Sequence, residues 1–528
     1  MTSQTEQRQF FKGAFILTYA GLLGKVLSAV YRIPLQNLTG DLGFYTYQQI
    51  YPLIATVMIL SLYGFPLAVS RLTAEQLHAG HRLSYRYYFF PVILTLFVIN
   101  GILALLLFIF APQLAHVMQD EYLITPLRLS ALLFLLIPFL AFFRGVFQAS
   151  LEMKQTAYSQ VIEQLVRVTI IIISAVFIFK GRIAVRFIAE LGVLSSFVGM
   201  SLAIIVLAIF FLRRYPLKKT VVDAHKKVEW RTYFMTLLTF GMIAALNHLT
   251  LIFIQFIDVL TLVPQLIKAG FTPLMAMEEK GVFDRGIPLI QFGAVIGSSF
   301  ALAFVPLLTK QNSTEQKHSL RDALSLSVYL ASGATIGLIV IYEEVNKLLF
   351  KDTLGTPVLQ ILSLSILLLS LVITGSAILQ AYGYVRWTVL ALCLSLLVKA
   401  ILNYALVPLW ASYGSALATI FSLLCLSILI IGKLTHNIQF SLWKHFRFLP
   451  FIGANGAMAL YLIFVKWLFP AMALNRFGLF IYVIFLVSTG ALIYLLILLR
   501  YNVLEERQLR ALPLAGKLMT LQKMIQHK

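Results

Sequence analysis

The chain alternates long apolar runs with short polar segments over its whole length of 528 residues. The runs approach twenty residues, the length at which an α-helix crosses a bilayer, and charges, prolines or glycines bound them. This pattern predicts fourteen transmembrane helices, with the shortest break, between the eleventh and the twelfth, at residues 410–414. Their approximate centres are residues 23, 58, 99, 134, 168, 198, 246, 296, 332, 368, 397, 422, 458 and 488.

Internal repetition organises these helices further. Residues 148–167 align without a gap with residues 380–399. The matched positions are Gln148/Gln380, Ala149/Ala381, Thr156/Thr388, Leu165/Leu397 and Val166/Val398, with Lys154/Arg386 and Arg167/Lys399 keeping the charge. We therefore predict two six-helix lobes related by a pseudo-two-fold axis, plus two C-terminal helices. Transporters built from such repeats hold substrate where the two halves meet and expose it to each side in turn.

The repeat and the hydropathy pattern divide the chain into five expected parts. A loop dense in cations follows the sixth helix, and the segment after residue 500 places apolar residues at helical spacing among cations, as in interfacial helices. The parts are an N-lobe (1–215), a cytoplasmic linker (216–230), a C-lobe (231–435), helices 13 and 14 (436–500) and a cytoplasmic amphipathic tail (501–528).

The composition supports a membrane protein. Hydrophobic residues make up 60% of the chain and charged residues 12%, and the mean hydropathy of +0.89 excludes an array of soluble domains. Cys393 and Cys425 lie in apolar spans, so neither a disulfide framework nor a cysteine metal site is expected. The polar N-terminus lacks a cleavage pattern, which predicts a retained first helix and no signal peptide.

The formal net charge of +21 first indicates how the chain is oriented in the membrane. With the N-terminus in the cytoplasm, most of the 42 Lys and Arg residues fall in inner loops, as the positive-inside rule requires. Both termini are therefore predicted to be cytoplasmic. Charge of this kind meets anionic lipid, which removes the argument for a nucleic-acid partner.

Charges inside the spans are the candidate chemistry. Lys25 and Arg32 lie seven residues apart, and hence on one face of the first span. A charged side chain near the bilayer centre costs about 3 kcal/mol, so this face should line a watery or protein interior. Alternatively, Arg32 reaches the outer interface and Lys25 pairs with a carboxylate. The cations within spans are Lys25, Arg32, Arg128, Arg167, Arg285 and Lys399, against the acids Glu163, Glu190 and Asp258.

This excess of positive charge favours an anionic ligand such as a phosphate or pyrophosphate. Glu163 and Arg167 are four residues apart and are expected to form a structural pair on their own helix. Arg285 is a candidate ligand contact. Asp258 and Lys399 form the expected long-range pair, with Asn403 one turn from Lys399. That pair is either a static buried salt bridge or one whose partners exchange during transport.

No motif for hydrolysis or metal chemistry accompanies these charges. The sequence contains no P-loop and no His/Cys cluster with metal-ligand spacing. An ATP-driven pump and a metal enzyme are therefore not expected, and neither is a cofactor.

Three runs of the sequence resemble one group of transporters. They are KVLSAVYRIPLQNLTGDLGFYTYQQIYPL, FPLAVSRLTAEQ and GVFDRGIPLIQFGAVIGSSFALAFVPLLTK. In these runs the chain resembles the polysaccharide-biosynthesis branch of the MOP exporter superfamily and, within it, the stage V sporulation protein B and MurJ-type lipid II flippases. The likeness covers nearly the whole chain.

The resemblance implies a two-lobed transporter of fourteen helices with a central cationic cavity, whose last two helices form a groove for a lipid tail. The implied substrate is an undecaprenyl-pyrophosphate-linked sugar, moved across the bacterial plasma membrane. By position, Lys25, Arg32 and Arg285 match the cavity cations of the family. Gln48 and Gln49, in the first run, are further candidate substrate contacts.

The resemblance also concerns a cation site. Some MurJ-type flippases hold a sodium ion between helices seven, eleven and twelve, and the matching positions here are Asp258, Lys399, Asn403 and Thr419. Lys399 departs from that site because its ammonium group would lie where the metal lies. We therefore predict a tethered cation in place of sodium, a coupling or gating role for these four residues, and no resident metal.

The leading hypothesis is a flippase, not an enzyme, for a lipid-linked cell-wall precursor, with lipid II as the first candidate. Teichoic acid, capsule or spore-cortex intermediates stay open as substrates. A cation-coupled multidrug exporter would need acidic residues on the first span, a membrane-embedded transferase would show clustered acids or histidines, and a scaffold would survive neutralising the interior cations. The expected partners are the lipid-linked sugar, membrane lipids and cell-wall synthesis proteins.

Overall fold

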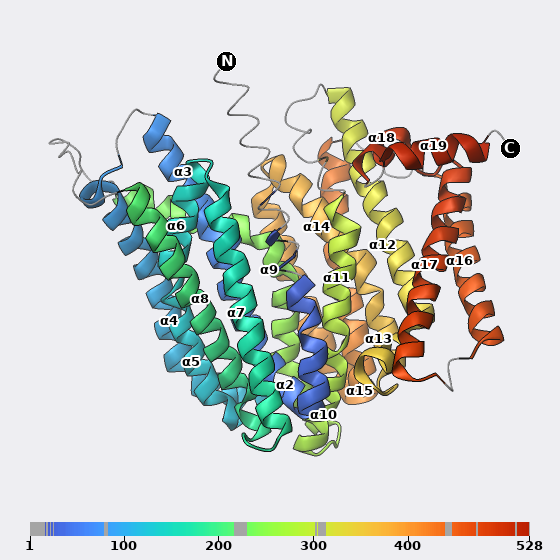
Figure 1. Ribbon diagram of the computed structural model, residues 1–528, viewed down its shortest axis with the longest axis horizontal. Coiled ribbons are helices and arrows are strands. Elements are labelled where there is room, and N and C mark those ends of the chain that lie inside the picture. The colour runs from blue at the N-terminus through green and yellow to red at the C-terminus, as the bar shows by residue number, and fades with distance from the viewer. Residues whose placement is uncertain are drawn as a thin grey trace. The chain divides into compact units, whose positions relative to one another are not determined.

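The fold is described by a computed structural model that covers residues 16, 20, 21, 23, 24, 26–78, 83–215, 230–300, 304, 313–438, 446–470, 474–512 and 515–526. Within these ranges the backbone is helical almost throughout and holds no β-strand (Figure 1). The predicted all-α membrane protein is confirmed.

The helices form two compact units, each with its own packing. The first consists of Met1–Pro264 and Thr272–Gly281, and the second of Gln265–Phe271 and Val282–Lys528. The helices of the first unit are α2 (Arg32–Ile59), η1 (Leu60–Gly64), α3 (Phe65–His78), η2 (Tyr85–Phe89), α4 (Phe90–Met118), η3 (Glu121–Leu123), α5 (Ile124–Phe134), α6 (Ile137–Ala149), α7 (Met153–Phe179), η4 (Val185–Phe187) and α8 (Ile188–Arg214), with most of α9 (Trp230–Lys268) and α10 (Pro273–Asp284).

The second unit begins before α11 and includes the C-terminal helices. Its members are α11 (Gly286–Ser299), α12 (Ser313–Phe350), α13 (Thr356–Ser363), α14 (Ser365–Ala381), α15 (Val385–Ile438), α16 (Phe448–Leu468), α17 (Arg476–Arg500), α18 (Glu506–Ala511) and α19 (Ala515–Gln526). The predicted linker at 216–230 lies outside the described residues except for Trp230, and the five predicted domain boundaries stay predictions.

Eleven helices of the described chain are long and apolar enough to cross a membrane. Two of them, Val26–His78 and Val385–Asn437, have 53 residues each. At 1.5 Å per residue such a helix would measure about 80 Å, more than twice the bilayer core, so each is too long for a single crossing. The count of fourteen spans and the grouping into two six-helix lobes stay predictions.

Both long segments contain a break in the backbone. Inside α2, Gly40 has φ 70° and ψ −176°, a conformation essentially confined to glycine. Inside α15 the break falls at Trp410 and Ala411, where φ of Ala411 is 46°. The predicted break at residues 410–414 is therefore confirmed. These two turns reverse the chain and bring each half of a long segment beside the other.

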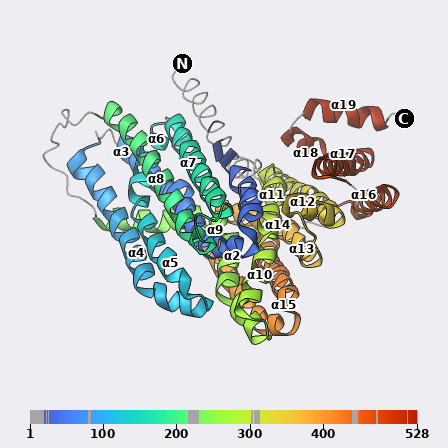
Figure 2. The ribbon, with the colours of Figure 1, turned by 60° about the horizontal axis from the view of Figure 1, so that its bottom comes forward.

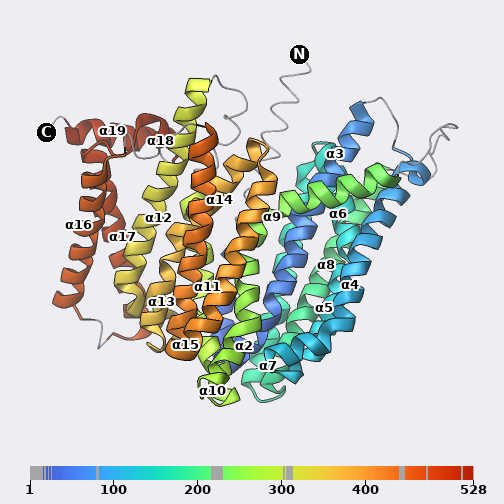
Figure 3. The same cartoon turned by 180° about the vertical axis from the view of Figure 1, so that it is seen from behind.

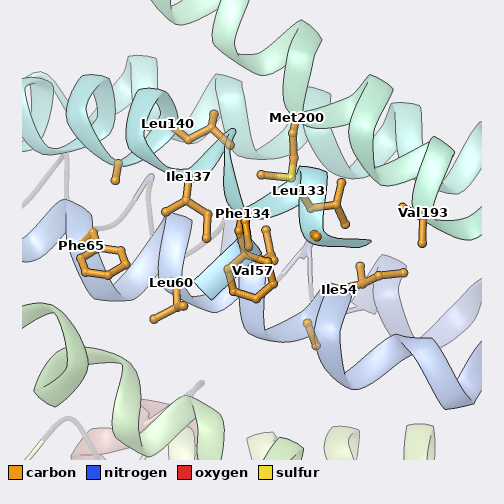
Figure 4. Close-up of a cluster of buried hydrophobic side chains, with 14 of the residues drawn as sticks. Ile54, Val57, Leu60, Phe65, Leu133, Phe134, Ile137, Leu140, Val193 and Met200 are labelled. Atoms are coloured by element: carbon orange, nitrogen blue, oxygen red, sulfur yellow. The ribbon is translucent and has the colours of Figure 1, made fainter. Parts of the chain in front are cut away.

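A buried apolar cluster holds the first unit together (Figure 4). Val57 of α2, Leu60 of η1 and Phe65 of α3 face Ile137 of α6 and Met200 of α8, and all five side chains are buried. Lipid tails are as apolar as these side chains, so the cluster stabilises the unit by close packing and not by removal from water. It fixes the π-helical turn η1 against α6, which contains the buried Arg144.

The C-terminal helices lie at one edge of the second unit. In Figures 1, 2 and 3, α16 and α17 run side by side, and α19 lies across the end of α17. The segment before α18 is tied to α12 by an ion pair between Glu505 Oε1 and Arg321 Nη2 (2.5 Å). Gln508, which is buried, donates to Ser325 Oγ (2.8 Å). The tail is therefore docked on protein, and its contact with the membrane surface stays a prediction.

Candidate functional site

A fully buried arginine opens α2 in the first unit. Arg32 is 0% exposed, and none of its three guanidinium nitrogens has a hydrogen-bond partner among the described residues. Its Cζ lies 3.9 Å from the centroid of the Tyr51 ring, a cation–π contact. A ring face does not replace the hydrogen bonds that a buried guanidinium loses on leaving water. The hydration that Arg32 loses on burial is thus not replaced by hydrogen bonds from the described residues.

Three tyrosines and a second arginine surround Arg32. The hydroxyl groups of Tyr31 and Tyr47 are 2.5 Å apart, and the rings of Tyr47 and Tyr51 lie 6.0 Å apart, centroid to centroid. Arg167 of α7 is 2% exposed, and its Cζ lies 5.7 Å from the centroid of the Tyr31 ring. The structure therefore brings Arg32 and Arg167 into one tyrosine-lined interior.

The partner of Glu163 is not the one that helical spacing predicts. Glu163 Oε2 accepts from Arg144 Nη2 at 2.6 Å, whereas Arg167 donates to Gln164 Oε1 at 2.5 Å and contacts the sulfur of Met58. The expected Glu163–Arg167 ion pair is thus replaced by a pair between α6 and α7.

Arg144 is the residue that sequence reasoning missed. It is 1% exposed and also donates to the carbonyl oxygen of Ser61 in η1 (3.0 Å) and to Ser159 Oγ (3.1 Å). It thereby joins three helical elements and neutralises the Glu163 carboxylate. A cation inside the apolar run AFFRGVF was the signal that could have identified it.

Three further residues of the first unit are predicted substrate contacts, namely Lys25, Gln48 and Gln49. Lys25 lies outside the described residues. Gln48 and Gln49 are buried, and Gln49 donates to the hydroxyl group of Tyr45 (3.1 Å). The amide oxygens of both glutamines lack a hydrogen-bond partner in the part of the chain that the structure covers. They are buried polar groups of α2, and their role toward a ligand stays a prediction.

Arg285 belongs to the second unit and already has an anionic partner. Its Nη1 and Nη2 donate to the two carboxylate oxygens of Asp352 at 2.6 and 3.1 Å. The guanidinium carbon also lies 5.2 Å from the centroid of the Phe350 ring. Such bidentate pairs are the strongest arginine–carboxylate geometry. A ligand that uses Arg285 must therefore compete with Asp352.

Lys399, in α15, is buried among oxygen atoms. Its ammonium group donates to the carbonyl oxygen of Ser415 (2.9 Å), to Ser415 Oγ (3.2 Å) and to Thr419 Oγ1 (2.7 Å). Because these oxygens already accept hydrogen bonds from the ammonium group, they do not fit an additional sodium ion. Asn403 is buried in the same helix, whereas Asp258 belongs to the first unit, so the Asp258–Lys399 pair stays a prediction.

The chain is similar in sequence to a protein family and to bacterial membrane proteins. A family model described as polysaccharide biosynthesis protein matches residues 10–312. The uncharacterized membrane protein YabM of Bacillus subtilis strain 168 is 32% identical over 514 residues, which cover 96% of this chain and 96% of the relative. The lipid II flippase MurJ of the same organism is 23% identical over 439 residues, covering 78% of this chain and 80% of the relative.

A solved structure shares the fold. The lipid II flippase MurJ in an inward closed conformation matches with a TM-score of 0.65 at 14% identity, covering 92% of this chain and 98% of the solved one. Sequence and fold therefore point to the same group of membrane proteins, in agreement with the resemblance of the three sequence runs.

Proposed function

The chain belongs to the polysaccharide biosynthesis protein family, and on this premise we propose that it is a flippase for an undecaprenyl-pyrophosphate-linked cell-wall precursor, with lipid II as the first candidate. It would act in the bacterial plasma membrane by alternating access, with both termini in the cytoplasm. The relative with the name lipid II flippase supports this choice of substrate.

Arg32 is the observation that carries the proposal. A guanidinium that is fully buried and has no hydrogen-bond partner within the described ranges is stable only if something offsets its lost hydration. A pyrophosphate offers several acceptor oxygens and negative charge, which a planar guanidinium binds in pairs of hydrogen bonds. Lys25, seven residues earlier, is proposed as a second contact, and Gln48, Gln49 and Arg285 keep their predicted contact roles.

The charge around Arg32 disfavours the multidrug alternative. A cationic drug needs an available carboxylate, but Glu163 is paired with Arg144 at 2.6 Å. The remaining cations of this cluster, Arg32 and Arg167, would repel it. The interior of the first unit therefore favours an anion.

The C-terminal helices supply the surface that a lipid tail requires. Trp467 of α16 and Phe477 of α17 are more than two-thirds exposed, as are other large apolar side chains on this pair. In a membrane such surfaces meet acyl or isoprenyl chains. We propose that α16 and α17 accompany the lipid part of the substrate.

For the coupling step, we propose that the tethered ammonium of Lys399 takes the place of a transported cation. Its three oxygen contacts within 3.2 Å support this assignment. Asn403, Thr419 and Asp258 are proposed to act with it.

The proposal is tested in a bacterium whose own lipid II flippase can be depleted. The native chain and Arg71→Gln should restore growth and surface-accessible lipid II, whereas Arg32→Gln should not, at equal amounts of membrane protein. Arg71 is the matched control because its half-exposed side chain pairs with Glu75 away from the buried cluster. Rescue by Arg32→Gln equal to that of the native chain would refute the role of Arg32. Rescue of a teichoic acid or capsule export defect instead would replace lipid II as the substrate.

A further inference from the structure

Arg167 shares the environment of Arg32 although it comes from a different helix. The same three tyrosines, Tyr31, Tyr47 and Tyr51, interact electrostatically with both guanidinium groups. Both are at most 2% exposed. The two cations therefore face one polar interior of the first unit, between α2 and α7, which pack against each other.

No carboxylate in the described part of the chain forms an ion pair with Arg32 or Arg167, although Glu163 interacts electrostatically with Arg167. Glu163, one turn from Arg167 on α7, gives its Oε2 to Arg144. Arg167 donates a hydrogen bond to one amide oxygen, that of Gln164, and its Nε has no hydrogen-bond partner among the residues covered. Two buried positive charges with so few acceptors are unfavourable unless an anion joins them.

The internal repeat supplies a comparison within the same molecule. The residue that aligns with Arg167 is Lys399, a buried cation at the corresponding place of the second half. Lys399 has three oxygen contacts from Ser415 and Thr419. The protein thus supplies three oxygen acceptors for the cation at position 399. At the aligned position 167 it supplies only some of the acceptors that a guanidinium group can use.

We propose that Arg167 is a second ligand-binding residue, which together with Arg32 forms a two-guanidinium site for a diphosphate group. The inference rests on the proposed function and deepens it, since it assigns two arginines to the two phosphoryl groups of the head. The hydroxyl groups of Tyr31 and Tyr47 hydrogen-bond to each other, and the proton not used in that bond is an additional donor to the same anion. The diphosphate can be free or attached to an isoprenyl chain, and the two sources are separated by experiment.

The test is thermal unfolding of the purified full chain in detergent, titrated with sodium pyrophosphate, phosphate or sulfate at matched ionic strength, and with farnesyl diphosphate against farnesol. A ligand that binds only the folded protein raises Tm in proportion to its affinity. Pyrophosphate or farnesyl diphosphate should raise Tm saturably. Arg167→Gln should weaken the apparent affinity about tenfold or more, the loss of one charge-assisted contact. Arg71→Gln should respond like the native chain.

Each outcome decides the inference. A response to farnesyl diphosphate alone that Arg167→Gln removes supports the site and assigns the lipid-linked source. An equal response to sulfate, no response at all, or an Arg167→Gln variant with lower resting Tm but native titration overturns it. If Arg167→Gln does not fold, Arg167→Lys, which keeps the charge but loses the planar fork, should show the same weakening to a smaller extent. Failed flipping with an intact Arg167-dependent response refutes the proposed transport alone.

Discussion

Replacing Arg144 by methionine is expected to destabilise the first unit and also to weaken its response to diphosphate. Arg144 makes three hydrogen bonds, to Glu163, Ser61 and Ser159, from a position that is 1% exposed. Removing one partner of a buried ion pair leaves the other charge uncompensated, which costs about 3–5 kcal/mol. Methionine fills a similar volume, so this loss reflects charge and hydrogen bonding more than a cavity.

The effect on the ligand comes from the carboxylate that the substitution releases. Glu163 lies one helical turn from Arg167 on α7, so without Arg144 it can pair with Arg167. An internal carboxylate at Arg167 competes with an anion from outside. The matched variant Glu163→Gln also breaks the Arg144 pair but leaves no free carboxylate. It should lose comparable stability while keeping the diphosphate response.

The two variants therefore separate stability from ligand binding. The assay is thermal unfolding of the purified full chain with and without diphosphate. Arg144→Met should show both a lower Tm and a weaker response, and Glu163→Gln only the lower Tm. In the double variant Arg144→Met/Glu163→Met, most of the lost stability should return, since no charge stays unpaired. Equal diphosphate responses of the two single variants would refute the reasoning.

Three further predictions concern single positions. Gly40→Ala should destabilise the chain by about 1–3 kcal/mol, because a backbone φ of 70° at the α2 break is strained for a residue with a side chain. The control Gly101→Ala lies inside α4, where an added Cβ meets open space, and should not lower Tm. Burial raises the pKa of Asp120, so its ionised form costs stability above the folded pKa. As the pH falls toward that pKa, the native chain should gain Tm relative to Asp120→Asn. Parallel curves of Tm against pH for the two proteins would refute this. Lys399→Asn should make transport in vesicles depend on sodium, and sodium-independent transport by this variant would count against the tethered cation.

Most of the fold follows from hydropathy because membrane helices must be long, apolar and internally hydrogen-bonded. The α15 break shows how local this information is. Residues 410–414 interrupt an otherwise continuous apolar run, and the backbone leaves the helix at Trp410 and Ala411. The helix α10 was not predicted, because a 12-residue helix is too short to give a membrane-span signal.

The ion-pair partners of buried charged residues were harder to predict from the sequence. Spacing along one helix identifies residues that can meet, such as Glu163 and Arg167, but it contains no information about a neighbouring helix. Arg144 is 19 residues from Glu163 and reaches it only because α6 and α7 pack together. For the same reason the Asp352 partner of Arg285, 67 residues away, could not be read from the sequence.

The contrast between Arg167 and Lys399 has a physical cause in what packs against each helix. The α15 break folds the helix back, so that Ser415 and Thr419, 16 and 20 residues beyond Lys399, present oxygens to its ammonium group. One of the helices that pack against α7 is α8, which meets the α7 main chain at Gly199, where a Cβ would come within 2.7 Å of the Glu163 carbonyl oxygen. A glycine contact lets the helices approach closely but brings no side-chain oxygen to Arg167. The two positions that align in the sequence therefore differ in their contacts, since Lys399 has three oxygen partners and Arg167 has one amide oxygen and a sulfur atom.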